Sequence, residues 1–254
     1  MLRPRIIPCL LVHKKGLVKT INFKNPKYVG DPINAVKIFN EKEVDELIVL
    51  DMDATVDGRE PDFTMIKNLA AECRMPLCYG GGVKSVDHAK KIINLGAEKV
   101  AISSAAIENP SLVAAIAEAV GKQSVIAVLD VKKKGLFGKY EVFIHNGTKA
   151  TGKDPREFAI ELERQGVGEI VINSIDQDGV MKGFDLKLTE LIREAVNVPI
   201  TTLGGAGSLA DLKHIIDKFG IIGVAAGSLF VFKGIYKAVL INYPKREEIN
   251  TMLK

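Results

Sequence analysis

The sequence predicts a single (β/α)8 barrel, because short apolar runs alternate with longer amphipathic runs and the two halves of the chain resemble each other. Nearly all-apolar strands are typical of a parallel sheet that helices cover. Eight strand–helix units in 254 residues fit one barrel domain over residues 1–254. A doubly wound open sheet is the structural alternative. The strands are expected at residues 5–11, 46–51, 76–80, 99–103, 124–130, 168–174, 198–203 and 222–226.

Helices are expected between these strands, and several carry a recognisable start. Asp31 and Asp154 each precede a proline, Asn109 precedes Pro110, and Ser208 begins the last helical pattern. Side chains of Asp, Asn and Ser accept hydrogen bonds from the free N–H groups of a helix start, and proline fits the first turn. The helical patterns lie near residues 31–44, 61–74, 85–95, 109–120, 155–166, 185–196 and 208–219.

An internal repeat supports the barrel. The run "DELIVLDMD" matches "GEIVINSID" 123 residues later, and "YGGGVKS" matches "LGGAGS" at the same spacing, which pairs Gly81 with Gly204. Two half-barrels of four units, approximately residues 1–122 and 123–254, are therefore expected. In this alignment the end of the first strand holds Leu11, whereas its twin holds an acid, Asp130.

The composition argues against nucleic-acid and membrane partners. The formal net charge is +4 at pH 7, from 35 basic and 31 acidic residues. The densest basic run, residues 132–139, is expected to be a solvated loop, since no basic stripe with interleaved aromatic residues accompanies it. No apolar run is long enough to cross a membrane, and the first residues do not form a signal-peptide pattern. We therefore expect a cytoplasmic protein.

The three cysteines predict no disulfide and no zinc site. Cys9, Cys73 and Cys78 lack the paired spacing of metal ligands. Two of them lie in apolar runs, where free cysteine behaves as a small hydrophobic residue. We expect neither a metal nor a cofactor.

Paired glycines and serines predict phosphate sites at the carboxyl ends of the strands, where such barrels place their active sites. Glycine lets backbone N–H groups approach phosphate oxygens, and serine adds a hydroxyl donor. Glycines also make ordinary turns, but here the glycine pairs recur at equivalent positions of the two halves of the chain, which favours phosphate sites. The two sites would lie on opposite sides of the barrel, where they suit a ligand with a phosphate at each end. One site combines Gly81, Gly82, Ser103 and Ser104, and the other combines Gly204, Gly205, Gly227 and Ser228.

Asp130 lies between these two sites and is the candidate general acid or base. A salt bridge to a nearby lysine is its alternative role. Lys19 follows the first strand and either binds phosphate or is solvated. Asp178 and Gly179 belong to "DQDGVMKG", a loop that could order over a ligand. Asp51 and Asp53 are expected to have structural roles at the end of the second strand.

Five motifs together resemble the HisF family, the cyclase subunits of imidazole glycerol phosphate synthase. They are "RIIPCL", "FKNPKYVGDPINAV", "YGGGVKS", "SIDQDGVMKGFD" and "LGGAGS", and they span essentially the whole chain in order. The resemblance implies a (β/α)8 barrel that pairs with a glutaminase, HisH. Ammonia then enters at the amino-terminal face and reacts with a bisphosphate ribonucleotide at the carboxyl-terminal face.

The resemblance also implies site residues, and this sequence departs from the family pattern at several of them. The family's catalytic acid of strand 5 is present as Asp130, whereas that of strand 1 falls on Leu11. Family substrate contacts fall on Ser103 and Ser104, on Asn173 instead of a threonine, and on Leu203 instead of a serine. The matching positions are Lys19, Gly82, Asp178, Gly179, Gly205 and Ser228. Because leucine cannot transfer a proton, the usual cyclase chemistry is expected to be impaired.

Four charged residues at the starts of strands correspond to a family ring that gates ammonia entry. They are Arg5, Glu46, Lys99 and Glu169, with the same signs as in the family. Two cations opposite two carboxylates can close the barrel as a hydrogen-bonded set. Ordinary ion pairs, which contribute little to stability, are the alternative.

Three functions follow from the resemblance. Within the HisF family, "IPCLL" and "CYGGG" are similar to the WbuZ-type proteins of surface-polysaccharide sugar amidation. The first hypothesis is therefore an ammonia-channelling subunit that acts with a HisH-like glutaminase and an ATP-dependent sugar amidotransferase in lipopolysaccharide synthesis. The second is a working cyclase of histidine biosynthesis. The third is a non-catalytic scaffold that binds and activates a glutaminase.

Overall fold

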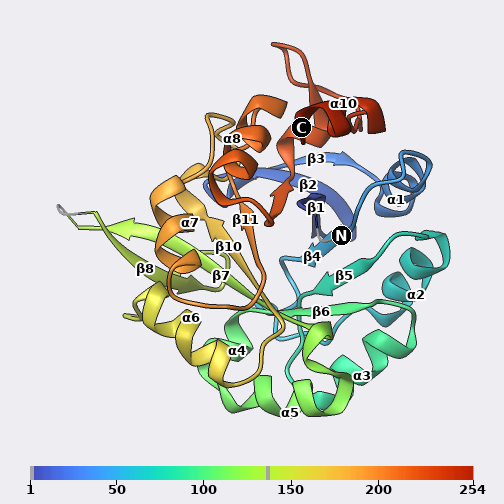
Figure 1. Cartoon of the computed structure of the whole chain (residues 1–254). Coiled ribbons are helices and arrows are strands. Elements are labelled where there is room, and N and C mark those ends of the chain that lie inside the picture. Colours follow the sequence, from blue (N-terminus) through green and yellow to red (C-terminus); the bar gives the residue numbers. More distant parts are fainter. Residues whose placement is uncertain (1–2, 136–137, 254) are drawn as a thin grey trace.

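Eight parallel strands close into a barrel in the computed structural model, which describes residues 3–135 and 138–253. Each strand pairs in parallel with the next, and the last pairs with the first, which confirms the predicted (β/α)8 barrel. Figure 1 shows the strands at the centre and the helices around them. The strands are β1 (Arg5–His13), β4 (Leu47–Asp51), β5 (Leu77–Gly80), β6 (Lys99–Ile102), β7 (Val125–Lys134), β10 (Glu169–Ser174), β11 (Ile200–Leu203) and β12 (Gly223–Ala226).

Helices cover the outside of the barrel. Asp31 accepts from the Asn34 N–H at 2.9 Å, and Ser208 accepts from Asp211, so these expected caps are present. The expected cap at Asn109 is absent, because a short extra helix precedes it and Pro110 occupies the N-cap position. The helices are α1 (Pro32–Glu41), α2 (Phe63–Glu72), α3 (Val86–Asn94), α4 (Ser104–Glu108), α5 (Ser111–Val120), α6 (Pro155–Arg164), α7 (Leu186–Arg193), α8 (Leu209–Phe219), α9 (Ser228–Val231) and α10 (Arg246–Met252).

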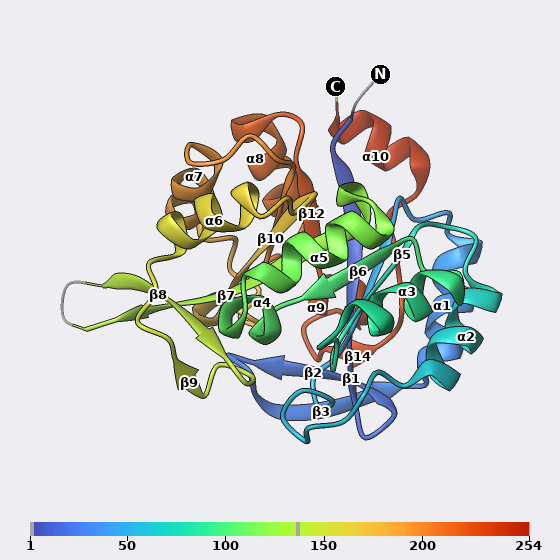
Figure 2. The ribbon, with the colours of Figure 1, turned by 90° about the horizontal axis from the view of Figure 1, so that it is seen from below.

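Hairpins extend the barrel at the carboxyl ends of β1 and β7, and both lie on the same side of the molecule in Figure 2. The prediction of a loop over residues 132–139 is wrong for the first and last residues of this range, because β7 continues to Lys134 and β8 begins at Lys139. Pairing Val131 with Val142 buries both valines, and the free energy gained by burying their apolar side chains favours strands here. Residues 136 and 137 of the expected loop lie outside the described residues. The hairpin strands are β2 (Gly16–Ile21), β3 (Lys24–Gly30), β8 (Lys139–Ile144), β9 (Lys149–Ala150), β13 (Phe232–Lys233) and β14 (Ala238–Val239).

The core has two parts, as the alternation of strand side chains requires. Outward-facing residues such as Ile6, Tyr79 and Ile172 pack between the barrel and the helices. Inward-facing residues fill the barrel, and we call them the interior layer. The interior layer consists of Ile7, Cys9, Ile48, Cys78, Ala101, Ile126, Val128, Val171, Leu203 and Ala225.

Within residues 3–135 and 138–253, each helix is too short or too polar to cross a membrane.

Candidate active site at the carboxyl ends of the strands

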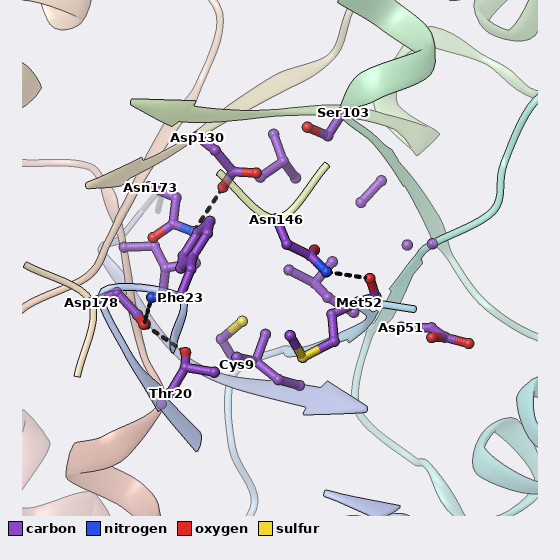
Figure 3. Close-up of a pocket in the computed structure, with 18 of the residues that line it drawn as sticks. Cys9, Thr20, Phe23, Asp51, Met52, Ser103, Asp130, Asn146, Asn173 and Asp178 are labelled. Atoms are coloured by element: carbon purple, nitrogen blue, oxygen red, sulfur yellow. Dashed lines mark hydrogen bonds between the residues drawn. The ribbon is translucent and has the colours of Figure 1, made fainter. Parts of the chain in front are cut away.

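A cavity of about 1220 Å³, including the open space at its entrance, lies at the carboxyl ends of the barrel strands, which we call the mouth. All of the predicted phosphate-site residues line it, and so do Asp130, Asn173 and Lys19. The structure therefore brings these residues together, as a barrel mouth should. Figure 3 shows Asp130, Asn173, Ser103 and Asp178 around this cavity.

The side chains at the ends of six of the barrel strands differ in polarity between the two halves of the mouth. Ser103, Asp130 and Asn173 come from the adjacent strand ends of β6, β7 and β10. Leu203, Leu11 and Leu50 face the same cavity from β11, β1 and β4. One half of the mouth is therefore polar, and the other half is mostly apolar.

Asp130 has one side-chain hydrogen-bond partner among the described residues. The Asn173 amide donates to its carboxylate with an Nδ2–Oδ1 distance of 2.9 Å. Burial raises the pKa of Asp130 to about 7, although the hydrogen bond from Asn173 opposes this rise. A carboxyl group with a pKa near the working pH can both accept and return a proton, as a general acid–base residue must. Among the described residues Asp130 forms no salt bridge with a lysine, since the nearby Lys133 and Lys134 pair with Asp185 and Glu141 instead.

Leu11 lies opposite Leu50 and beside Val18 in the sheet, and it lines the cavity where the family pattern places an acid. The position is thus part of the mouth rather than displaced from it. In this pocket Asp130 has no carboxylate partner on β1. Asp178 is the acid whose charge contributes to the raised pKa of Asp130.

The first predicted phosphate site contains a glycine loop that packs closely against the end of β4. Gly81 has a φ of +119°, and a Cβ there would lie 2.4 Å from the carbonyl oxygen of Asp51, so only glycine fits. The N–H of Gly82 donates to Thr55 Oγ1 at 3.1 Å. Asp51 accepts from the N–H groups of Asp53 and Ala54, which confirms its expected structural role.

The serines of this first site differ in their partners. Ser103 Oγ is buried without a hydrogen-bond partner among the described residues. Ser104 Oγ accepts weakly from the N–H of His145 at 3.5 Å. An unpartnered hydroxyl is available to a ligand, so Ser103 is the stronger donor candidate here.

The second predicted site holds a buried lysine. The ammonium of Lys19 donates to the carbonyl of Cys9 at 2.6 Å, and a Cβ on Gly227 would lie only 2.4 Å from its Nζ. Burial lowers the pKa of Lys19, while the nearby Cys9 and Asp178 act in the opposite direction. Lys19 is therefore not the solvated side chain of the alternative hypothesis, and it lies directly against the Gly227 backbone.

Asp178 and Gly179 anchor the β2–β3 hairpin beside the mouth. The Asp178 carboxylate accepts from Thr20 Oγ1 at 2.6 Å and from the N–H of Phe23 at 3.1 Å, as Figure 3 shows. Gly179 has a φ of +67°, and a Cβ there would lie 2.0 Å from the carbonyl oxygen of Thr20. The loop is thus ordered against the hairpin through close backbone contact.

Replacing Asp178 with alanine is expected to release this hairpin. The change removes both side-chain bonds, and each bond to a charged acceptor is worth about 1.5–3 kcal/mol. We expect amide hydrogen exchange of residues 20–23 to accelerate by about tenfold or more, with Val171 unchanged. The control is Asp176→Ala, because Asp176 accepts from the N–H of Lys133 instead. Equal exchange in wild type and Asp178→Ala would show that backbone contacts alone hold the hairpin.

Sequence reasoning missed the turn between β8 and β9. His145 and Asn146 of this turn line the cavity, and the Asn146 amide donates to the carbonyl of Met52 at 2.8 Å. Thr20 and Phe23 of the β2–β3 hairpin also line it. The sequence signal was the "HNG" turn, which marks a hairpin but does not indicate which distant loop it contacts.

The amino-terminal end of the barrel is closed by the four charged residues predicted there, which we call the ring. Arg5 contacts Glu46 and also Glu169, the latter at 2.6 Å. Lys99 contacts Glu46 at 2.7 Å and Glu169 at 3.0 Å, so cations and carboxylates alternate. Thr201 Oγ1 also donates to Glu169, at 2.5 Å.

The charges of the ring stabilise one another. Burial alone would lower the pKa of Lys99, but the charges of Glu169 and Glu46 outweigh it and raise that pKa. Burial would raise the pKa of Glu169, but hydrogen bonding and charge from Arg5 lower it. The contacts within the ring therefore favour the charged forms of Lys99 and Glu169.

Besides Asp130, the described residues include the Cys9 thiol and side chains of the types that bind metals. Burial raises the pKa of Cys9 to about 11, so this thiol is not a ready nucleophile. Within residues 3–135 and 138–253, no three His, Cys, Asp or Glu side chains gather as a metal site would require.

These features define a (β/α)8 barrel with an acid-bearing pocket at one end and a closed ionic ring at the other. The chain belongs to the histidine biosynthesis protein family, whose model matches residues 5–237, and within it to the HisF family.

Named relatives cover the chain almost end to end. It is 57% identical, over 98% of both chains, to "Putative imidazole glycerol phosphate synthase subunit HisF" of Leptospira interrogans. A protein of the same name from Leptospira borgpetersenii is 56% identical over 96% of both chains. "Imidazole glycerol phosphate synthase subunit HisF" of Clostridium botulinum strain Okra is 38% identical over 100% of both chains.

Proposed function

We propose that the chain is a HisF-type synthase subunit that receives ammonia at the ring and adds it to a phosphorylated substrate at the mouth. The observation that carries this proposal is the two-ended barrel, in which Asp130 and the ring face opposite ends of the apolar interior layer. The names of the relatives favour the imidazole glycerol phosphate synthase reaction over sugar amidation. A HisH-like glutaminase at the amino-terminal face supplies the ammonia.

The ring is the entry gate in this proposal. Its alternating charges form hydrogen bonds that must open for a molecule to pass, and the apolar layer behind it disfavours ions. A small neutral molecule such as ammonia can pass through this apolar layer more easily than an ion can.

A second candidate function is amidation of a surface-polysaccharide sugar together with an ATP-dependent amidotransferase. Leu11 favours it, because leucine replaces the acid of strand 1, and the mouth then lacks a proton-transfer group that the cyclase reaction of the family uses. A third candidate is the non-catalytic scaffold, in which the barrel only binds and activates a glutaminase and Asp130 transfers no proton.

A cyclase assay with ammonium salt and the bisphosphate ribonucleotide separates these functions. The proposal predicts ammonium-dependent formation of imidazole glycerol phosphate. The rate should fall about 10²–10⁴-fold below that of the Clostridium botulinum relative, as expected for loss of one positioned acid or base. Product formation no faster than without protein would reject the cyclase and favour the second candidate. Growth of a bacterium that lacks its own HisF, without added histidine, is the matching test in cells.

The gate is tested by reversing one charge of the ring. In Lys99→Glu three carboxylates meet Arg5, and like charges in a partly buried site repel. We expect glutamine hydrolysis by the glutaminase to become uncoupled from ammonia use at the mouth. Lys218→Glu, in an exposed pair with Glu190, is the control. Unchanged coupling in Lys99→Glu would leave the ring a purely structural feature.

Phosphate binding should differ between the two predicted sites. The site beside Leu203 lacks the hydroxyl that the family pattern places there, and one neutral hydrogen bond is worth about 0.5–1.5 kcal/mol. Calorimetry with inorganic phosphate is expected to show a stronger site that Ser103→Ala weakens, and a weaker site that Ser228→Ala weakens. Binding that is undetectable at millimolar phosphate would contradict a phosphorylated ligand.

A further inference from the structure

The amide of Asn173 presents an unused acceptor to the mouth. This side chain lies at the carboxyl end of β10, directly across from Asp130 in the sheet, and the residue is only 6% exposed. Its Nδ2 donates to Asp130, but no donor among the described residues reaches its Oδ1. A buried carbonyl oxygen without a donor costs about 1–3 kcal/mol, so this oxygen is a candidate contact for a ligand.

The orientation of this amide follows from its neighbour. An ionised Asp130 can only accept hydrogen bonds, so the Nδ2 group must face it and the Oδ1 atom must turn away. A threonine or leucine at this position could not place a carbonyl oxygen there. The free acceptor at Oδ1 therefore exists because an asparagine lies beside an aspartate at these two positions.

The path that leads to this oxygen is apolar. Val171 precedes Asn173 by one inward-facing position, and Val128 does the same for Asp130. The side chains of the interior layer are aliphatic or thiol groups, with backbone groups paired in the strand ladder. Asn173 Oδ1, the Asp130 carboxylate and the Ser103 hydroxyl are thus the polar side-chain groups at the strand ends on this side, and the first two lie on directly paired residues of the sheet.

We propose that Asn173 Oδ1 and the Asp130 carboxylate form a receiving site for ammonia at the mouth. The inference rests on the proposed function, since it requires ammonia to arrive through the barrel. Two N–H bonds of ammonia donate to the two acceptors, and the nitrogen lone pair remains directed toward the cavity. This geometry orients ammonia for attack, which is the contribution expected of a positioning site.

The chemical step at this site balances with the residues present. The nitrogen lone pair forms a bond to a carbonyl carbon of the phosphorylated substrate, and the carbon–oxygen π pair moves to the oxygen. Asp130 takes one proton from the nitrogen and returns a proton to that oxygen. Asn173 keeps its hydrogen bond throughout and transfers no proton, so it is a substrate-binding residue.

The test follows the Asn173 side-chain amide by NMR in the full-length protein. Its resonances are assigned by their loss in Asn173→Leu, and ammonium chloride is titrated at alkaline pH. We expect saturable shifts of this amide and of the Asp130 carboxyl carbon. Potassium chloride, which supplies a similar cation without N–H donors, should give neither shift. Shifts that are absent, or equal in potassium, would overturn the inference, and this comparison needs only the wild-type protein.

Two variants sharpen the test. Asn173→Leu should weaken the ammonium response at Asp130 by about tenfold or more, equivalent to about 1.4 kcal/mol. Asn146→Leu removes a different asparagine that lines the same cavity, and it should retain the response. Equal losses in both variants would contradict a specific role for Asn173.

Kinetics separate this inference from the proposed function. In an active enzyme, Asn173→Leu should raise KM for ammonium about tenfold or more while KM for the bisphosphate ribonucleotide stays unchanged. A merely structural change would raise both. Cyclase turnover without an ammonium response at Asn173 rejects the receiving site alone. An ammonium response without turnover supports the receiving site and rejects the proposed substrate.

Discussion

Replacing Glu169 with alanine is expected to lower the free energy of unfolding by about 3–5 kcal/mol, because it leaves two cations of the ring without one of their carboxylates. Glu169 is 5% exposed and also accepts from Thr201. Urea denaturation at neutral pH measures the effect. Glu190→Ala is the matched control, since its pair with Lys218 is exposed and such pairs contribute about 0–1 kcal/mol.

The same prediction has a defined pH dependence. Interactions with Arg5 lower the pKa of Glu169, so the folded protein releases this proton more readily than the unfolded chain does. The stabilisation is therefore complete above the ordinary glutamate pKa and is lost as the pH falls through the lowered value. The difference between wild type and Glu169→Ala should shrink in acid. An equal difference at neutral and acidic pH would assign the effect to lost packing instead of charge.

The second large effect is expected at Asp130, where activity and stability should change in opposite directions. Under the proposed function, Asp130→Asn removes the proton-transfer group, which typically lowers turnover about 10²–10⁴-fold. Burial holds the pKa of Asp130 at about 7, so the folded state binds this proton more tightly than the unfolded state. Stability is therefore lost as the pH rises from the ordinary aspartate range through 7.

Asparagine at position 130 avoids the destabilisation that a buried carboxylate causes at high pH, because its amide carries no charge. Thermal unfolding of Asp130→Asn at pH 8 should show stabilisation on the order of a few kcal/mol, which fades when the pH falls below the ordinary aspartate range. Asp217→Asn, on the exposed side of α8, is the control. Stabilisation that persists unchanged at acidic pH would mean that the carboxylate charge is not its cause.

The barrel was predictable because its signals are local. Buried strands such as β4 and β10 are nearly continuous apolar runs, and Asp31 and Ser208 mark helix starts by their own chemistry. The hairpins were not predictable in the same way. β3 is mostly exposed and polar, so its sequence carries no burial pattern, and the strand and turn before it contact Asp178, which is distant in the sequence.

The members of the candidate site were predictable from their places at strand ends, but their interactions were not. Asn173 and Asp130 each follow an apolar strand, yet the bond between them depends on the register of β7 with β10. The contact of Asn146 with Met52 joins residues 94 positions apart. The raised pKa of Asp130 arises from burial by many segments, which single positions in a sequence do not reveal.

The division of the mouth into a polar and an apolar half has a consequence for substrate direction. Under the proposed function, the glycine-rich sites at Gly81 and Gly204 would offer an elongated bisphosphate two opposite directions in which to lie across the mouth. Asp130 and Leu11 occupy twin positions and make those two directions unequal, since reversal would press polar groups of the ligand against leucine. Under the proposed function, Leu11 opposite Asp130 would therefore let the ligand bind across the mouth in one direction only.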